Sequence, residues 1–187
     1  MIEKALEILN DMVAAGVLRN YAIGGAVAAL NYIEPTVTDD LDVLISFDTA
    51  APSGLVTLGP IVSYLEAKGY TEWRKEGLVI EDWPVQFLPV ADSLDLESLE
   101  RALSVEDMFG PDTALSTRVL TAEHLMATAL KVGRPKDFLR IAAFLEQDAV
   151  DLDRLRDVLE RHGLMDQWTS FCRKTGQLDP LTAGRNP

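Results

Sequence analysis

The chain has 187 residues, 48% of them hydrophobic, and a formal net charge of −13. This length suits one domain, or one domain with a small appendage, and the apolar share is sufficient for a full core. The negative charge argues against non-specific DNA binding, which needs a positive field. Because no apolar run reaches the roughly 18 residues of a membrane helix, we expect no membrane association. The single cysteine, Cys172, excludes an internal disulfide and fits the reducing cytoplasm.

Apolar periodicity and glycine or proline breaks predict short strands and helices that alternate over the first 120 residues. The expected helices are 2–17, 24–32, 53–68 and 94–103, and the expected strands are 21–23, 41–47, 70–74, 78–81, 83–89 and 117–120. In the strand 83–89, Val85 and Phe87 alternate with Gln86 and Leu88, so one face is expected to be buried.

The rest of the chain has helical spacing. Thr121 is a suitable N-cap for a helix that runs to Val132, and Gly133-Arg134-Pro135 breaks the pattern. Further helices are expected at 136–147, 151–162 and 164–174, followed by a loose tail. The prediction is therefore an α/β (α+β) fold. A mixed β-sheet domain flanked by helices would span residues 1–120, and a C-terminal helical region packed on it would span 121–187.

A glycine pair and a pair of aspartates are the most informative local pattern. Gly24-Gly25 follows a short strand and opens a helix, and a glycine-rich helix start is a natural place for a phosphate. Asp40 and Asp42 stand at the edge of an interior strand, and residues two apart point to the same face. Two carboxylates side by side repel each other, and a divalent cation is the usual compensation. Phosphate and metal-binding carboxylates together indicate nucleotide chemistry.

Other enzyme classes that use such motifs fit less well. A dinucleotide-binding Rossmann site would need G-x-G-x-x-G, and no further glycine follows in register. An aspartyl-phosphate phosphatase would carry its D-x-D on the first strand with a following threonine, whereas Val43-Leu44 follows here. A nucleotide-sugar transferase could also use a D-x-D pair, but the chain is short for that class.

The combination of Gly-Gly, a short helix and T-x-D-h-D at the start of a strand (Thr38 to Asp42) resembles the signature of the nucleotidyltransferase fold, the polymerase β-like superfamily. The most similar type is that of small bacterial proteins related to abortive-infection toxins. The segment from Ala129 to Asp137 also resembles the K-x-x-R-x-K-D helix region of those proteins. The resemblance spans roughly residues 20–145.

The resemblance implies a role for each matched residue. Gly24 and Gly25 would let the backbone approach the β- and γ-phosphates, with Thr38 beside the nucleotide. Asp40 and Asp42 would be the catalytic carboxylates and would bind Mg²⁺, which takes a few carboxylates together with phosphate oxygens. The triphosphate contacts from the helical region would be Lys131, with Arg134 and Lys136 as secondary candidates.

A local basic patch agrees with that assignment. Residues 117–147 contain five basic and three acidic side chains in an otherwise acidic chain. Such a patch suits a polyanion such as a triphosphate. The alternative for Lys131 and Arg134 is an ordinary solvated helix face, and Asp137 either acts on the helix dipole or orients one of these two cations.

One departure from the family pattern leaves three hypotheses open. Active members carry a third acid on a later strand, where it helps to deprotonate the acceptor hydroxyl, and the matching residue here is Gln86. An amide cannot act as a base. The first hypothesis is a Mg²⁺-dependent nucleotidyltransferase that moves an NMP from an NTP, such as ATP, to RNA, a protein or a small molecule. The second is a catalytically degenerate relative that binds nucleotide or a partner protein, and the third is a purely structural module.

Overall fold

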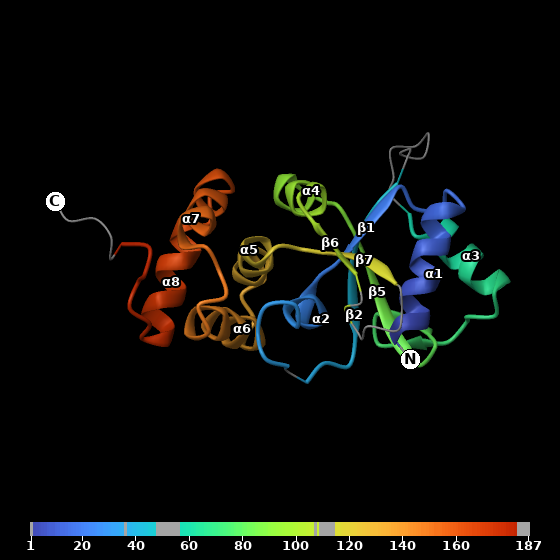
Figure 1. Ribbon diagram of the computed structural model, residues 1–187, viewed down its shortest axis with the longest axis horizontal. Coiled ribbons are helices and arrows are strands. Elements are labelled where there is room, and N and C mark those ends of the chain that lie inside the picture. Colours follow the sequence, from blue (N-terminus) through green and yellow to red (C-terminus); the bar gives the residue numbers. More distant parts are fainter. Residues whose placement is uncertain (1, 36, 48–56, 107, 109–114, 183–187) are drawn as a thin grey trace. The chain divides into compact units, whose positions relative to one another are not determined.

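The structure is a computed structural model that describes residues 2–35, 37–47, 57–106, 108 and 115–182 (Figure 1). The chain divides into two compact units. Met1–Ala28 and Thr36–Leu120 form the first, and Ala29–Pro35 and Thr121–Pro187 form the second. Among the described residues, none of the helices combines the length and the apolar character that crossing a membrane requires.

The first unit contains a mixed β-sheet of seven strands within the described residues, in the order β3-β4-β5-β2-β1-β7-β6. The strands are β1 (Asn20–Ile23), β2 (Leu41–Ser46), β3 (Trp73–Arg74), β4 (Gly77–Ile80), β5 (Trp83–Pro89), β6 (Leu103–Glu106) and β7 (Ser116–Val119). The pairs β2–β5 and β1–β7 are parallel and the other neighbours are antiparallel. β2 lies at the centre, and its Leu41, Val43 and Ile45 are fully buried. The predicted mixed sheet with flanking helices is confirmed.

The helices of the first unit are α1 (Ile2–Ala14), α3 (Gly59–Ala67) and α4 (Ser93–Glu100), and the short α2 (Gly25–Ala29) begins in it. α1 buries Leu6, Leu9 and Met12 at helical spacing and packs against β1. α4 begins at Asp92, whose carboxylate accepts the backbone N–H groups of Leu94 and Asp95 as an N-cap.

The second unit contains α5 (Ala122–Val132), α6 (Pro135–Glu146), α7 (Leu152–Arg161) and α8 (Met165–Thr175). α5 packs against the other three helices. Thr121 is the N-cap of α5, and Gly133 ends it with a left-handed backbone, φ +71°, as the sequence predicted. The large side chains of this core are Phe144, Trp168 and Phe171, each almost inaccessible to solvent.

Several predicted elements differ from the structure. The helix expected over 2–17 ends at Ala14 and the one expected over 24–32 ends at Ala29, while the helix expected from residue 53 begins at Gly59, with 53–56 outside the described residues. The strand expected over 70–74 consists only of Trp73–Arg74. The helix expected to reach Leu103 ends at Glu100, and Leu103 instead starts β6. β3 and β6 are outer strands with mostly exposed side chains, so they lack the apolar alternation that identifies a strand.

Cys172 behaves as a core residue rather than as a reactive thiol. Only 8% of the residue is exposed, and burial raises the pKa of the thiol to about 11. Because the thiolate is the reactive form, this side chain is inert near neutral pH in the folded protein.

Candidate functional site

The glycine corner is the turn between β1 and α2, and it lies against the start of β2. Gly24 directly follows β1, and its N–H donates to the Asp42 carbonyl oxygen at 2.9 Å. This bond continues the antiparallel β1–β2 ladder, in which Ile23 pairs with Val43. Gly25 then turns the chain into α2 with φ +59°, a backbone conformation that glycine adopts at no steric cost.

The absence of a side chain at Gly25 lets its backbone approach the Asp42 carboxylate closely. A Cβ atom built on Gly25 would lie 2.0 Å from Asp42 Oδ2 and 2.9 Å from its Cγ. Gly24 is under less constraint, because a Cβ atom there would meet nothing closer than the Leu120 Cδ1 at 3.6 Å. The predicted association of the glycine pair with the acidic pair is therefore a direct contact at Gly25 and Asp42.

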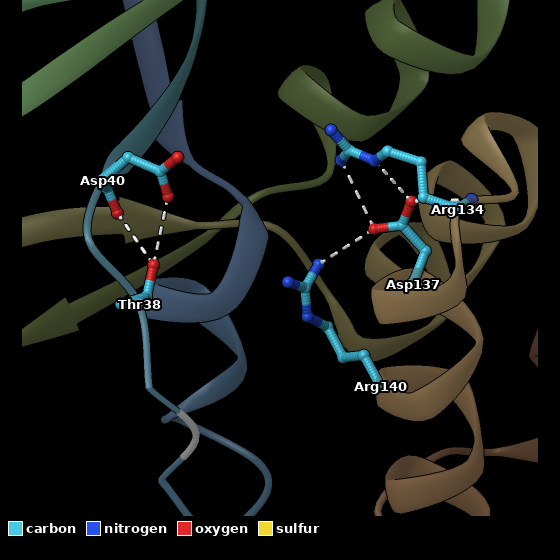
Figure 2. Close-up of polar contacts among 5 residues, drawn as sticks. All are labelled: Thr38, Asp40, Arg134, Asp137 and Arg140. Atoms are coloured by element: carbon cyan, nitrogen blue, oxygen red, sulfur yellow. Dashed lines mark hydrogen bonds and ion pairs between the residues drawn. The ribbon is translucent and has the colours of Figure 1, made fainter. Parts of the chain in front are cut away.

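The two aspartates occupy alternate positions at the head of β2. Leu41 and Val43 are fully buried, whereas Asp40 and Asp42 are intermediate in exposure. This alternation places the Asp42 carboxylate on the side of β2 opposite to the buried pair, and the exposure of Asp40, which directly precedes the strand, continues the same pattern. The Thr38 hydroxyl lies 3.1 Å from Asp40 Oδ1, to which it donates, and 3.2 Å from the Asp40 carbonyl oxygen (Figure 2). Thr38 therefore orients Asp40.

Gln86 lies beside Asp42 across the parallel β2–β5 pair, in which the two residues are register partners. Val85 and Phe87 are buried and Gln86 is half-buried, so the alternation predicted for this strand is confirmed. The Gln86 Nε2 donates to the Glu76 Oε2 at 2.9 Å. Glu76 belongs to the two-residue turn between β3 and β4.

Glu76 is a neighbour of the site that the sequence analysis missed. Its only signal was its place between two predicted strands, and nothing in the spacing indicated that this turn reaches Gln86. The contact depends on the pairing of β4 with β5, in which Leu78 lies opposite Val85.

The basic residues predicted to contact phosphate lie in the second unit. Lys131 is an exposed residue of the last turn of α5, Arg134 is the N-cap of α6, and Lys136 is exposed in the first turn of α6. Gly24, Gly25, Thr38, Asp40 and Asp42 lie in the first unit. The structure joins Gly24 and Gly25 to Asp42, and Thr38 to Asp40, through the contacts described above.

Asp137 is a buried carboxylate that organises the start of α6. It is 1% exposed, and its Oδ2 accepts the Arg134 Nε at 2.8 Å and the Arg134 backbone N–H at 3.1 Å (Figure 2). The Arg140 Nη1 lies 3.8 Å from Asp137 Oδ1. Asp137 has both of the roles considered for it. It is an acid in the first turn of α6, and it orients Arg134.

The donor set at the head of β2 fits a hard cation. Among the described residues, no group of three or more His, Cys, Asp or Glu side chains is placed to hold a metal ion. The Asp42 carboxylate on β2 and the Asp40 carboxylate just before it would leave the remaining ligand positions to a substrate. This is how Mg²⁺ usually binds when it accompanies a triphosphate.

Comparisons with known proteins identify the fold. No protein-family model and no curated protein matches the chain. A nucleotidyltransferase-like antigenic protein from Paracoccidioides brasiliensis superposes with a TM-score of 0.55 at 11% identity, over 92% of this chain and 87% of that one. Two structures of ANT(2'')-Ia, one in complex with adenylyl-2''-tobramycin and one in solution, give TM-scores of 0.46 at 15% and 16% identity, over 88% and 95% of this chain and 98% and 100% of theirs. The first likeness shows that the chain has a nucleotidyltransferase-like fold, as its motifs predicted.

Proposed function

We propose that the chain is a Mg²⁺-dependent nucleotidyltransferase that moves a nucleoside monophosphate from an NTP, with ATP as the first candidate, to a hydroxyl group. The acceptor belongs to RNA, to a protein or to a small molecule. The observation that carries the proposal is the contact of the Gly25 backbone with the Asp42 carboxylate at the head of a central strand in this fold. This combination suits a Mg²⁺-bound triphosphate, because backbone N–H groups bind phosphate and carboxylates bind Mg²⁺.

Each residue at the head of β2 has a distinct part in this reaction. Gly24 and Gly25 would present their backbone to the phosphates, and the missing side chain of Gly25 also makes room for the Asp42 carboxylate. Asp40, oriented by Thr38, and Asp42 would hold Mg²⁺. When bound, the metal supplies the positive charge that neutralises the triphosphate and activates the acceptor hydroxyl. That hydroxyl attacks the α-phosphorus, and the bond to pyrophosphate breaks.

Lys131, Arg134 and Lys136 lie in the second unit, and the nucleotide binding that the family resemblance implies for them stays a prediction. The Arg134 Nε donates to the buried Asp137, which limits the conformational freedom of a guanidinium that is 55% exposed. We further propose that the protein acts in the cytoplasm. The resemblance to abortive-infection toxins is the basis for including RNA among the acceptors.

A second candidate function is a degenerate relative that binds nucleotide or a partner protein without turnover. Gln86 favours this alternative, because it stands beside Asp42 where a third carboxylate is expected. An amide cannot take the proton of the acceptor hydroxyl. The two candidates differ in turnover and agree in nucleotide binding.

A transfer assay separates them. The protein is incubated with Mg²⁺ and each labelled NTP, with and without total RNA or a small-molecule acceptor, and both transferred label and pyrophosphate are measured. The enzyme hypothesis predicts product with wild type and a loss of at least 100-fold with Asp42→Asn. The matched control is Asp82→Asn in the β4–β5 turn, where φ is +73° and asparagine is well tolerated.

Equal product from wild type and Asp42→Asn would end the enzyme hypothesis, because the carboxylate would then have no part in the reaction. Nucleotide binding by wild type without product would favour the degenerate relative. The Asp82→Asn control is expected to match wild type, since the exposed Asp82 lies in a turn at the opposite end of β4 from Glu76.

A further inference from the structure

The Glu76 carboxylate lies beside Gln86, the position on β5 where a third carboxylate is expected. Gln86 is the register partner of Asp42, and its side-chain amide donates to Glu76 Oε2 at 2.9 Å. Glu76 comes from the β3–β4 turn, so this carboxylate comes from a different element than the strand residue it accompanies. The series Asp42, Gln86 and Glu76 therefore runs from the proposed metal ligand to a third acidic side chain through one strand pairing and one hydrogen bond.

A second contact ties the same turn to the head of β2. The Lys75 Nζ lies 3.8 Å from Asp39 Oδ2, in the residue that precedes Asp40. The next residue after Glu76 is Gly77, and a Cβ atom there would lie 3.0 Å from backbone atoms of Pro84 and Val85. The close approach of β4 to β5 places this turn beside β5, and the ion pair between the exposed Lys75 and Asp39 side chains links it to the residue before Asp40.

We propose that Glu76 is the general base of the transfer reaction and that Gln86 is its positioning residue. This inference rests on the proposed function. Glu76 takes the proton from the acceptor hydroxyl as the oxygen forms its bond to the α-phosphorus. The bond between that phosphorus and the pyrophosphate oxygen breaks, and its electron pair leaves with pyrophosphate. The proton ends on Glu76 and is released to solvent afterwards.

The amide at residue 86 suits this arrangement. It donates a hydrogen bond that fixes the Glu76 carboxylate, and it adds no negative charge directly beside Asp42. A carboxylate in the same place would repel Asp42 across the strand pair. Gln86 therefore orients the base and Glu76 takes the proton, whereas a single acidic side chain on β5 would do the second without a partner on that strand.

The test compares Glu76→Gln with Glu72→Gln. Glu72 precedes β3 in the same hairpin, and its carboxylate pairs with Arg74 at 3.1 Å. Glu76→Gln is expected to lower kcat by about 100-fold or more, which is the usual contribution of a general base. The affinity for Mg-ATP, measured by calorimetry, is expected to stay within twofold of wild type, and Glu72→Gln is expected to match wild type in both measurements.

An exchange variant makes the test independent of simple damage to the fold. The double variant Glu76→Gln/Gln86→Glu restores one carboxylate and one amide to the same hydrogen-bonded pair. It is expected to transfer label at least tenfold faster than Glu76→Gln, and more slowly than wild type because its new carboxylate lies beside Asp42. Recovery supports a carboxylate requirement at this pair.

Different outcomes overturn the inference and the proposed function. A Glu76→Gln protein that transfers label at the wild-type rate overturns the role of Glu76 and leaves the proposed function standing. The same holds if Glu76→Gln is slow but loses Mg-ATP binding in equal measure, or if the exchange variant recovers nothing. Absence of product from the wild-type protein contradicts the proposed enzyme, and with it the role of Glu76.

Discussion

At Gly25, both the backbone conformation and the neighbouring Asp42 carboxylate require a residue without a side chain. Its φ of +59° disfavours any side chain, and a Cβ atom would occupy the space of the Asp42 carboxylate. Gly25→Ala is therefore expected to lower the free energy of unfolding by about 1–2 kcal/mol, the cost of a left-handed alanine. It is also expected to displace the Asp42 carboxylate, because that flexible side chain yields more easily than the backbone. Chemical denaturation gives the first quantity, and a crystal structure of the variant gives the second.

Gly24→Ala is the matched control for that substitution. Its Cβ atom would make only ordinary van der Waals contacts, and no left-handed conformation is required at this position. We expect its free energy of unfolding to fall by less than about 1 kcal/mol. Equal losses in the two variants would contradict a special role for Gly25.

At the level of elements, the buried Asp137 is expected to stabilise the start of α6. Asp137→Ala removes the hydrogen bond to the Arg134 backbone and leaves the half-buried Arg140 without this charge partner. Loss of a fully buried pair costs about 3–5 kcal/mol, but Arg134 is 55% exposed, so we expect a loss of about 2 kcal/mol. Thermal and urea unfolding measure the change.

Asp153→Ala tests whether that effect comes from burial. Asp153 also makes an ion pair with a residue three positions later, Arg156, at 3.1 Å, but its side chain is 92% exposed. The expected loss is about 0.5 kcal/mol or less. If the two alanine variants lose the same stability, burial of Asp137 has no special effect.

The elements that the sequence predicted well carry strong local signals. α5 has a threonine N-cap, a periodic apolar face and a glycine at its end, and all three lie within the helix or next to it. β6 has none of these, because it is an outer strand that pairs with β7, and Leu103 is 48% exposed. Local patterns identify an element through the side chains it buries, so a strand that buries few is missed.

The residues of the candidate site that lie close together in the sequence could also be predicted from local patterns. The glycine pair and the aspartates are close in sequence, and strand periodicity places both carboxylates on one face. Gln86 was identified from the family pattern. Glu76 could not be found, because its contact depends on the registers of two strand pairs, β2–β5 and β4–β5. β2 and β5 are far apart in the sequence, so no local turn fixes the register between them.

For the whole molecule, the sheet order explains why residues distant in sequence meet at the head of β2. β2 is flanked by β1, which ends at the glycine corner, and by β5, which carries Gln86. The outer neighbour of β5 is β4, whose preceding turn supplies Glu76. A nucleotide site at this edge therefore requires the assembled sheet, and ligand binding is expected to stabilise the first unit as a whole.

Calorimetric titration of Mg-ATP tests the central claim, that the Asp42 carboxylate beside Gly25 holds a metal-bound triphosphate. Wild type and Asp82→Asn are expected to bind with the same affinity, and Asp42→Asn is expected to bind at least tenfold more weakly because one carboxylate ligand is lost. The account would be contradicted if Asp42→Asn bound Mg-ATP as tightly as wild type, or if the folded wild-type protein bound none.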